Sequence, residues 1–245
     1  MNFYAIDFGH TNYKIAFIEN GNVVSVHVNN YQDKFAFSEL NVKIKESECK
    51  KILCCNVLSK YMIDKVVEEL PFETKNILKF FNSEDCQKYI SLAYKKNINR
   101  LGADRAINLV GASKKTKTDL VVIDAGTATT IDYLDSAQNH LGGIIVPSKN
   151  TIDNIFSEIL DFNFSDEEFV DNIFSTNTRS CIENGSAISA YGVINNILDK
   201  MFEIKKNIPK IYVTGGNAKH IIDNCNYPII HVESLLFDGL VVLDA

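Results

Sequence analysis

The sequence predicts an α/β fold made of two similar lobes. Apolar segments rich in β-branched residues alternate with segments of helical spacing, and a strand–turn–strand pattern near residue 7 recurs near residue 124. The 245 residues are 46% hydrophobic, which is enough to fill two cores. A polar segment at 114–119, KKTKTD, separates the two patterns. We therefore expect an N-terminal lobe at residues 1–117 and a C-terminal lobe at residues 118–245.

The secondary-structure elements follow from hydrophobic periodicity. In the N-terminal lobe, short apolar runs bounded by turn residues predict strands at residues 3–6, 14–18, 23–28 and 51–57. Apolar residues three and four apart predict helices there at residues 58–70 and 103–113. In the C-terminal lobe the same criteria predict strands at residues 120–123, 129–133, 144–146 and 211–214. They also predict helices there at residues 180–200 and, more weakly, 218–223.

The charge of the chain restricts its partners. Charged residues make up 23% of the sequence and the formal net charge is −6, so there is no general basic surface for nucleic acid or anionic lipid. The chain starts without an apolar leader, and no stretch approaches 18 uninterrupted apolar residues. We therefore expect a cytoplasmic protein that binds neither nucleic acid nor a membrane. The six cysteines lack C-x-x-C spacing, which favours reduced, mostly buried thiols over a zinc site.

The recurring pattern suggests a phosphate-binding site. FYAIDFGHTNYKIAF aligns with LVVIDAGTATTIDYL, so that Asp7 corresponds to Asp124 and Gly9 to Gly126. Either stretch alone is equally well an ordinary hairpin turn. Its recurrence in both halves favours a nucleotide, because glycine lets backbone N–H groups approach phosphate oxygens and threonine adds hydroxyl donors. A carboxylate such as Asp7 repels phosphate directly, but it can hold a hydrated divalent cation that bridges to the phosphates.

Two glycine pairs extend this pattern. LGGIIVP spans residues 141–147, and VTGGNAKHI spans residues 213–221, where a strand leads through a turn into a helix. The P-loop motif is absent. This order of motifs resembles the superfamily of acetate and sugar kinases and actin-like ATPases. The resemblance implies two ribonuclease H-like lobes, each a mixed sheet flanked by helices, with the nucleotide in the cleft between them.

Two longer motifs narrow the resemblance. LGADRAINLVGA at 101–112 and VVIDAGTATTIDYLD at 121–135 are similar to the type III pantothenate kinase family. That family has G-x-D-R, D-x-G-T-A-T-T, G-G-x-I-x-P, a threonine before a helix, and T-G-G in this order. The resemblance implies ATP-dependent phosphorylation of pantothenate to 4′-phosphopantothenate, the first step of coenzyme A synthesis. It also implies a homodimer that uses ATP with Mg²⁺ and requires K⁺ or NH₄⁺.

The resemblance assigns roles to individual residues. Asp104 corresponds to the base that faces the pantothenate hydroxyl. The pantothenate site is expected to include Gly102, Ala103, Asp104, Arg105, Thr178 and Tyr94. ATP is expected to contact Thr127 and the first phosphate loop, which comprises Asp7, Phe8, Gly9, His10, Thr11, Asn12, Tyr13 and Lys14. Asp124 corresponds to the ligand of the monovalent cation, and Asp7 to the residue that holds Mg²⁺ through water.

The sequence departs from the family at three positions. His10 stands where Asn is usual, and Ser148 follows the GGIIVP motif where Gly is usual. The family's substrate tyrosine aligns with Lys95, so Tyr94 replaces it only after a one-residue slip. Asp132 and Asp135, which follow the second loop, are expected to be solvated residues of a hairpin.

Other interpretations of the same residues stay open. Asp104 and Arg105 are equally an ordinary ion pair in the first turn of a helix. A degenerate homologue that binds ligand without turnover is one alternative function, and an actin-like or chaperone-like ATPase is another, although such proteins are longer. The apolar face of the 180–200 helix, with Ile182, Ile188, Tyr191 and Ile194, suits either a dimer interface or the core.

Overall fold

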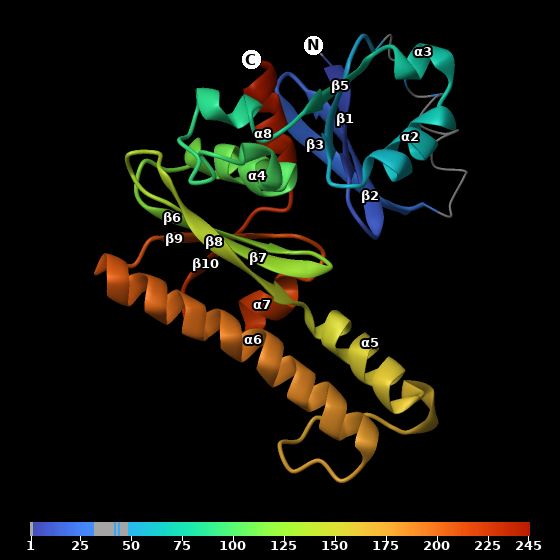
Figure 1. Ribbon diagram of the computed structural model, residues 1–245, viewed down its shortest axis with the longest axis vertical. Helices are drawn as coiled ribbons and strands as arrows, with labels where there is room; N and C mark the ends of the chain where they lie inside the picture. The colour runs from blue at the N-terminus through green and yellow to red at the C-terminus, as the bar shows by residue number, and fades with distance from the viewer. Residues whose placement is uncertain (1, 32–41, 43, 45–48) are drawn as a thin grey trace. The chain divides into compact units, whose positions relative to one another are not determined.

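The computed structural model describes residues 2–31, 42, 44 and 49–245, and these residues form two five-stranded sheets flanked by helices (Figure 1). The predicted α/β fold is confirmed. The chain divides into two compact units. The first comprises residues 1–117, 134–142 and 234–245, and the second comprises residues 118–133 and 143–233. The C-terminal segment is therefore part of the first unit.

The sheet of the first unit has the strand order β3-β2-β1-β4-β5. Its strands are β1 (Asn2–Phe8), β2 (Asn12–Glu19), β3 (Asn22–Asn30), β4 (Ile52–Asn56) and β5 (Leu78–Phe81). β1, β2 and β3 form an antiparallel meander, whereas β4 runs parallel to both β1 and β5. β5 was not predicted from the sequence, because it contains only four residues and its apolar and polar residues do not alternate regularly.

Helices lie on both sides of this sheet (Figure 1). They are α2 (Lys60–Glu68), α3 (Phe72–Lys75), α4 (Ala103–Ser113) and α8 (Leu235–Asp244), with short 3₁₀ turns at Asp85–Lys88 and Ile98–Arg100. Side chains alternate between the two faces of a strand. Tyr4, Ile6 and Phe8 of β1 therefore share a core with α2, together with Ile52 and Cys54 of β4. Asp7 and Cys55 point to the opposite face, which α4 and α8 cover.

The sheet of the second unit has the strand order β10-β9-β6-β7-β8. Its strands are β6 (Leu120–Ala125), β7 (Ala128–Leu134), β8 (His140–Pro147), β9 (Lys210–Thr214) and β10 (Ile229–His231), and β9 is parallel to both β6 and β10. The connection between β7 and β8 belongs to the first unit, where the Ser91 N–H donates to the Gln138 carbonyl at 2.8 Å.

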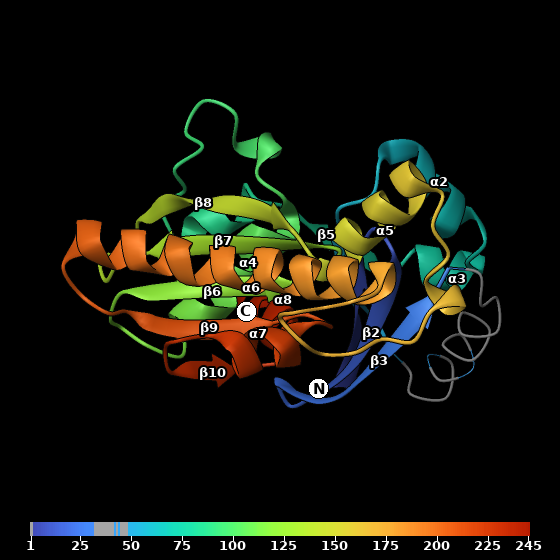
Figure 2. The ribbon, with the colours of Figure 1, turned by 90° about the horizontal axis from the view of Figure 1, so that it is seen from below.

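Three helices and a 3₁₀ turn complete the second unit: α5 (Lys149–Leu160), Phe164–Asp166, α6 (Thr178–Lys205) and α7 (Ala218–Asn224). α6 lies along one face of the sheet (Figures 1 and 2), and its C-terminal half supplies Ile194, Ile197, Leu198 and Phe202 to the core. Of the four α6 residues proposed for an interface, Ile194 is thus in the core, whereas Ile188 is exposed. None of the helices in the described part of the chain is both long and apolar enough to span a membrane.

The structure shows the surroundings of several side chains that the sequence singles out. Asp132 is not a solvated hairpin residue, because its position within β7 leaves it only 2% exposed. Ser148 caps α5: its Oγ accepts a hydrogen bond from the Thr151 N–H at 3.2 Å, so the departure from glycine supplies a helix cap. The cysteines are free thiols, and Cys54, Cys55 and Cys86 are fully buried.

Candidate active site

The first predicted phosphate loop is the turn between β1 and β2. The register pairs Asp7 with Lys14 and Phe8 with Tyr13, so residues 9–11 form the tip. A Cβ atom at Gly9 would lie 2.8 Å from the carbonyl oxygen of Asn12, which explains why glycine occupies this position. The Tyr31 hydroxyl donates to the Gly9 carbonyl at 2.7 Å and holds the turn from the residue that follows β3. The sequence analysis did not identify Tyr31.

The loop residues divide into an exposed tip and a buried base. His10, Thr11 and Asn12 are exposed, whereas Phe8 and Tyr13 are completely buried and belong to the core. Within the predicted loop, the side chains available to a phosphate are therefore those of residues 10–12 and Lys14. Lys14 Nζ lies 3.8 Å from Asp7 Oδ2.

Asp7 is 7% exposed although it ends a strand at the loop. Burial of a carboxylate is costly unless it is compensated, and Lys14 provides part of this compensation. Burial raises the pKa of Tyr31, and the nearby charge of Asp7 raises it further.

The G-x-D-R segment forms the start of α4. Gly102 is the N-cap residue, and Asp104 lies in the first turn, where its Oδ1 accepts a hydrogen bond from the Arg105 N–H at 2.8 Å. A Cβ atom on Gly102 would collide with Asp104 Oδ1, so glycine at residue 102 keeps the space that this carboxylate occupies. Asp104 is half-buried and Arg105 is buried.

The charges of Asp7 and Asp104 both act on a buried thiol. Cys55 is opposite Asp7 in the β1–β4 register and is fully buried. Burial raises the pKa of the Cys55 thiol, and the charges of Asp7 and Asp104 raise it further. Asp7, the first residue of the first loop, and Asp104, at the start of α4, both belong to the first unit although they are distant in sequence. The sequence analysis assigned no role to Cys55.

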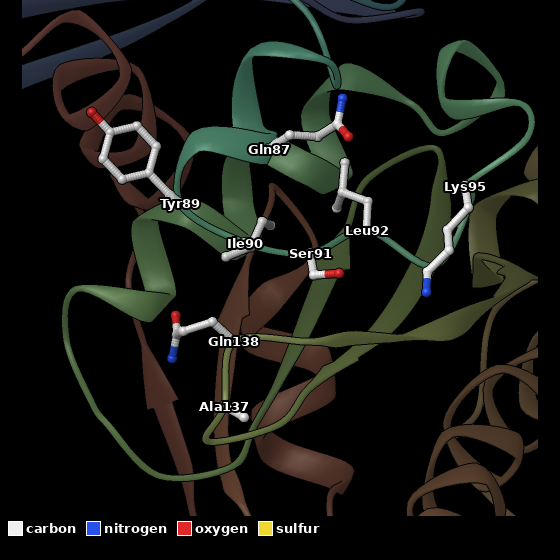
Figure 3. Close-up of a pocket in the computed structure, with 8 residues that line it drawn as sticks. All are labelled: Gln87, Tyr89, Ile90, Ser91, Leu92, Lys95, Ala137 and Gln138. Atoms are coloured by element: carbon white, nitrogen blue, oxygen red, sulfur yellow. The ribbon is translucent and has the colours of Figure 1, made fainter.

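The side chains of Tyr94 and Lys95 have different surroundings. The Tyr94 ring is stacked on the His140 ring, with 6.3 Å between their centroids. Lys95 instead lines an open pocket of about 500 Å³, whose other walls are Gln87, Tyr89, Ile90, Ser91, Leu92, Ala137 and Gln138 (Figure 3). None of the predicted site residues lines this pocket.

The second predicted loop connects β6 to β7 in the second unit. Asp124 is half-buried and lies opposite Thr214 of β9, and Thr127 is exposed. The loop is held from the start of α5, because Thr151 Oγ1 donates to the Thr127 carbonyl at 2.7 Å. The side chain of Asn217 donates to the Gly126 carbonyl at 3.1 Å, and its backbone N–H donates to the Ala125 carbonyl at 3.0 Å. Thr151 and Asn217 were not identified from the sequence.

The T-G-G turn packs against this second loop. Gly215 has a φ of +94°, and a Cβ atom there would lie 2.6 Å from the carbonyl carbon of Ala125. Only glycine fits this backbone-to-backbone contact. Gly216, in contrast, faces open space, because no atom would lie within 4 Å of a Cβ placed there.

Thr178 is separate from the second loop. It is the exposed first residue of α6, at the end of the helix that lies away from the sheet (Figure 1). Within the second unit, Asp124 and Thr127 therefore share one loop, and Thr178 belongs to another surface.

The carboxylates suit the cations that the sequence resemblance implies. Asp7 and Asp124 each offer oxygen ligands at the edge of a glycine turn, and oxygen is the donor that Mg²⁺ and K⁺ prefer. Among the described residues, no group of three or more His, Cys, Asp or Glu side chains is arranged to hold a metal ion. Hydrated Mg²⁺ takes its remaining ligands from phosphates and water.

Comparisons with a family model and with known proteins point to the same family. The model of the family "Type III pantothenate kinase" matches residues 3–200. A type III pantothenate kinase of Finegoldia magna is 26% identical over 255 aligned positions, which cover 98% of this chain and 95% of that protein. The enzyme of the same name from Pelobacter propionicus is 31% identical over 149 positions, which cover 60% of this chain and only 58% of that protein.

Solved structures support the fold. A putative 2-dehydro-3-deoxygalactonokinase from Sinorhizobium meliloti has a TM-score of 0.62 at 9% identity, and the match covers 98% of this chain and 97% of that one. A putative Baf family transcriptional activator from Campylobacter jejuni has a TM-score of 0.57 at 20% identity, with 98% and 96% covered. At these identities the likeness concerns the fold alone.

Proposed function

Because the chain belongs to the type III pantothenate kinase family, we propose that it transfers the terminal phosphoryl group of ATP to the terminal hydroxyl of pantothenate. The products are 4′-phosphopantothenate and ADP, and the reaction is the first step of coenzyme A synthesis. The observation that best supports this proposal is the start of α4, where Gly102 leaves the space that the Asp104 carboxylate occupies.

Asp104 is the proposed general base. The pantothenate hydroxyl gives its proton to the Asp104 carboxylate while its oxygen attacks the terminal phosphorus, and ADP leaves with the electrons of the broken P–O bond. Phosphoryl transfer requires little covalent chemistry from the protein, so a positioned carboxylate and well-placed cations are sufficient. We assign Arg105 and the backbone of residues 102–103 to pantothenate binding, because the planar guanidinium suits the substrate carboxylate. Tyr94 is the proposed aromatic contact.

The ATP site is proposed to use both loops. In the first loop, the backbone around Gly9 and the side chains of His10, Thr11, Asn12 and Lys14 would contact phosphate oxygens. In the second loop, Thr127 would contact ATP. Mg²⁺ held through water at Asp7 and K⁺ or NH₄⁺ at Asp124 would supply positive charge against the phosphates.

We further propose a homodimer, in the cytoplasm, and the second unit offers a surface for it. Large apolar side chains are exposed on α5, on the connection that follows and on α6: Ile155, Phe156, Ile159, Leu160, Val170, Ile173, Phe174 and Ile188. Phe174 alone is 84% exposed. Exposed apolar side chains in such number favour a protein interface. Thr178 lies next to this surface in sequence, so dimerisation would allow it to contact pantothenate bound by the other copy.

A coupled assay of ADP release, with and without pantothenate, tests the proposal. We expect release that depends on pantothenate and K⁺. Release that is equal without pantothenate would identify an ATPase. No release under either condition, with ATP still bound, would identify a degenerate homologue.

A further inference from the structure

A charged side chain of α5 links this helix to α6. None of its twelve residues is buried, and several of its apolar residues face outward. Lys149, at the start of α5, is paired with Asp153 of the same helix at 2.6 Å and with Glu183 of α6 at 3.6 Å. Because a helix without buried residues gains little from apolar packing, these ion pairs contribute much of its attachment.

The same charges continue to the start of α6. Glu183 Oε1 accepts a hydrogen bond from Arg179 Nε at 2.7 Å. The Arg179 backbone N–H donates to Glu167 Oε2 at 2.8 Å, and its guanidinium donates to the Glu167 carbonyl at 2.7 Å. Arg179 directly follows Thr178, so this network fixes the backbone that carries Thr178.

The other end of the network reaches the second loop. Lys149 is two residues before Thr151, whose hydroxyl donates to the Thr127 carbonyl. Lys149 is therefore linked through nearby contacts both to Thr127, which is proposed to contact ATP, and to the start of α6 with Thr178, which is proposed to contact pantothenate. Among the described residues, Lys149 and Glu183 form the only ion pair between α5 and α6.

The side chains of this network are partly shielded from water, which strengthens the interactions between their charges. The charged side chains of Lys149, Asp153, Glu183 and Arg179 are between 15% and 28% exposed. Oδ1 of Asp153 is buried and has no hydrogen-bond partner among the described residues. Removal of the Lys149 charge would leave the Asp153 carboxylate without its cation, and an uncompensated, partly buried charge is unfavourable. Glu183 would keep its pair with Arg179, but the ion pair that links α5 to α6 would be lost.

We propose that Lys149 is a positioning residue that couples the second loop to the start of α6, so that Thr127 and Thr178 are held in place together. This inference rests on the proposed kinase function. It predicts that the charge of Lys149 matters for substrate binding although Lys149 itself contacts neither substrate in this arrangement.

Steady-state kinetics of matched variants test the proposal. We expect Lys149→Met to raise the KM for pantothenate by about tenfold or more with a smaller change in kcat, as loss of a charge-assisted contact does. Glu183→Gln removes the same inter-helix pair and also the pair with Arg179, so its effect should be at least as large. Asp153→Asn removes only the pair within α5 and should have a smaller one. Lys149→Arg should restore most of the pantothenate affinity. Lys200→Met, at an exposed lysine near the other end of α6, is the control.

Hydrogen–deuterium exchange gives a readout that does not need turnover. In Lys149→Met, peptides that cover residues 124–130 and 176–184 should exchange faster, whereas a peptide over β9 should be unchanged. An unchanged KM together with unchanged exchange at 176–184 would overturn the proposal. Faster exchange over the whole chain would also overturn it, because Lys149 would then serve only general stability. Failure of wild-type turnover, with the local exchange effect intact, would count against the kinase function but not against the coupling.

Discussion

The backbone of Gly102 borders the carboxylate of Asp104 so closely that a methyl group on residue 102 would collide with Oδ1. Gly102 has φ −54° and ψ 135°, a conformation that any residue adopts. Its requirement for glycine therefore comes from the neighbouring carboxylate and not from backbone strain.

Gly102→Ala should consequently displace the Asp104 side chain without unfolding the protein. We expect kcat to fall by roughly 10- to 100-fold, because a displacement of about 1 Å at a reacting group has an effect of this size. The thermal midpoint should change little. Steady-state kinetics and a thermal melt measure the two quantities, and a variant with wild-type kcat would show that Asp104 does not need its present position.

The crossing of α4 and α8 depends on a second pair of glycines. A Cβ atom on Gly239 would collide with the Ile107 carbonyl, and one on Gly111 would collide with the Leu235 carbonyl. Gly239→Ala should lower the free energy of unfolding by about 1–3 kcal/mol, because backbone atoms cannot move aside easily. Gly192→Ala in α6 is the matched control: it meets no atom within 4 Å and should stabilise the protein by about 0.5–1 kcal/mol. Urea unfolding measures both changes, and equal effects of the two variants would contradict the close approach of α4 and α8.

Asp244 makes the stability of the first unit dependent on pH. Burial acts to raise the pKa of this carboxyl, but its hydrogen bonds and ion pairs with Lys51 and Lys79 outweigh burial and hold the pKa below its usual value of 3.8. A lowered pKa in the folded state contributes stability above the unfolded pKa, and this contribution is lost as the pH falls through the folded pKa. The stability difference between the wild type and Asp244→Asn should therefore be constant near neutral pH and shrink below about pH 4. Urea unfolding at a series of pH values tests this, and a difference that grows on acidification would have the wrong sign.

Asp124 is proposed to hold the monovalent cation. Activity should rise with the potassium concentration and stay low in sodium, because K⁺ at Asp124 would offset phosphate charge. Asp124→Ala should lower activity and abolish the difference between the two salts. A wild-type enzyme that is equally active in both salts at constant ionic strength would exclude this role for Asp124.

The sequence predicted those elements whose pattern is local. α4 was predicted with its observed bounds, because its apolar residues follow helical spacing and its first turn contains Asp104. α8 was missed, because LLFDGLVVLD is apolar on nearly every side and therefore shows no helical periodicity of apolar and polar residues. α5 was missed although Ile152, Ile155, Phe156 and Ile159 follow helical spacing, and the capping preference of Ser148 was a second signal that could have revealed it.

The candidate site was predictable in its residue types but not in its supports. The repeated Asp-x-Gly turns indicated both loops, since glycine and aspartate serve recognisable purposes there. Cys55, Tyr31 and Asn217 support those turns from neighbouring elements, and nothing in their local sequence reveals these contacts. Lys149 likewise depends on Glu183, which is distant in sequence. Such contacts arise only from tertiary packing.

The most direct test of the central claim is identification of the product by mass spectrometry and phosphorus NMR, with ATP, Mg²⁺, K⁺ and pantothenate present. The account predicts one new phosphomonoester, on the terminal hydroxyl of pantothenate, formed in equal amount to ADP. Asp104→Asn should form it at least about 100-fold more slowly while its ATP affinity stays nearly unchanged. Absence of the phosphomonoester with the wild type, or its formation at the wild-type rate by Asp104→Asn, would contradict the account.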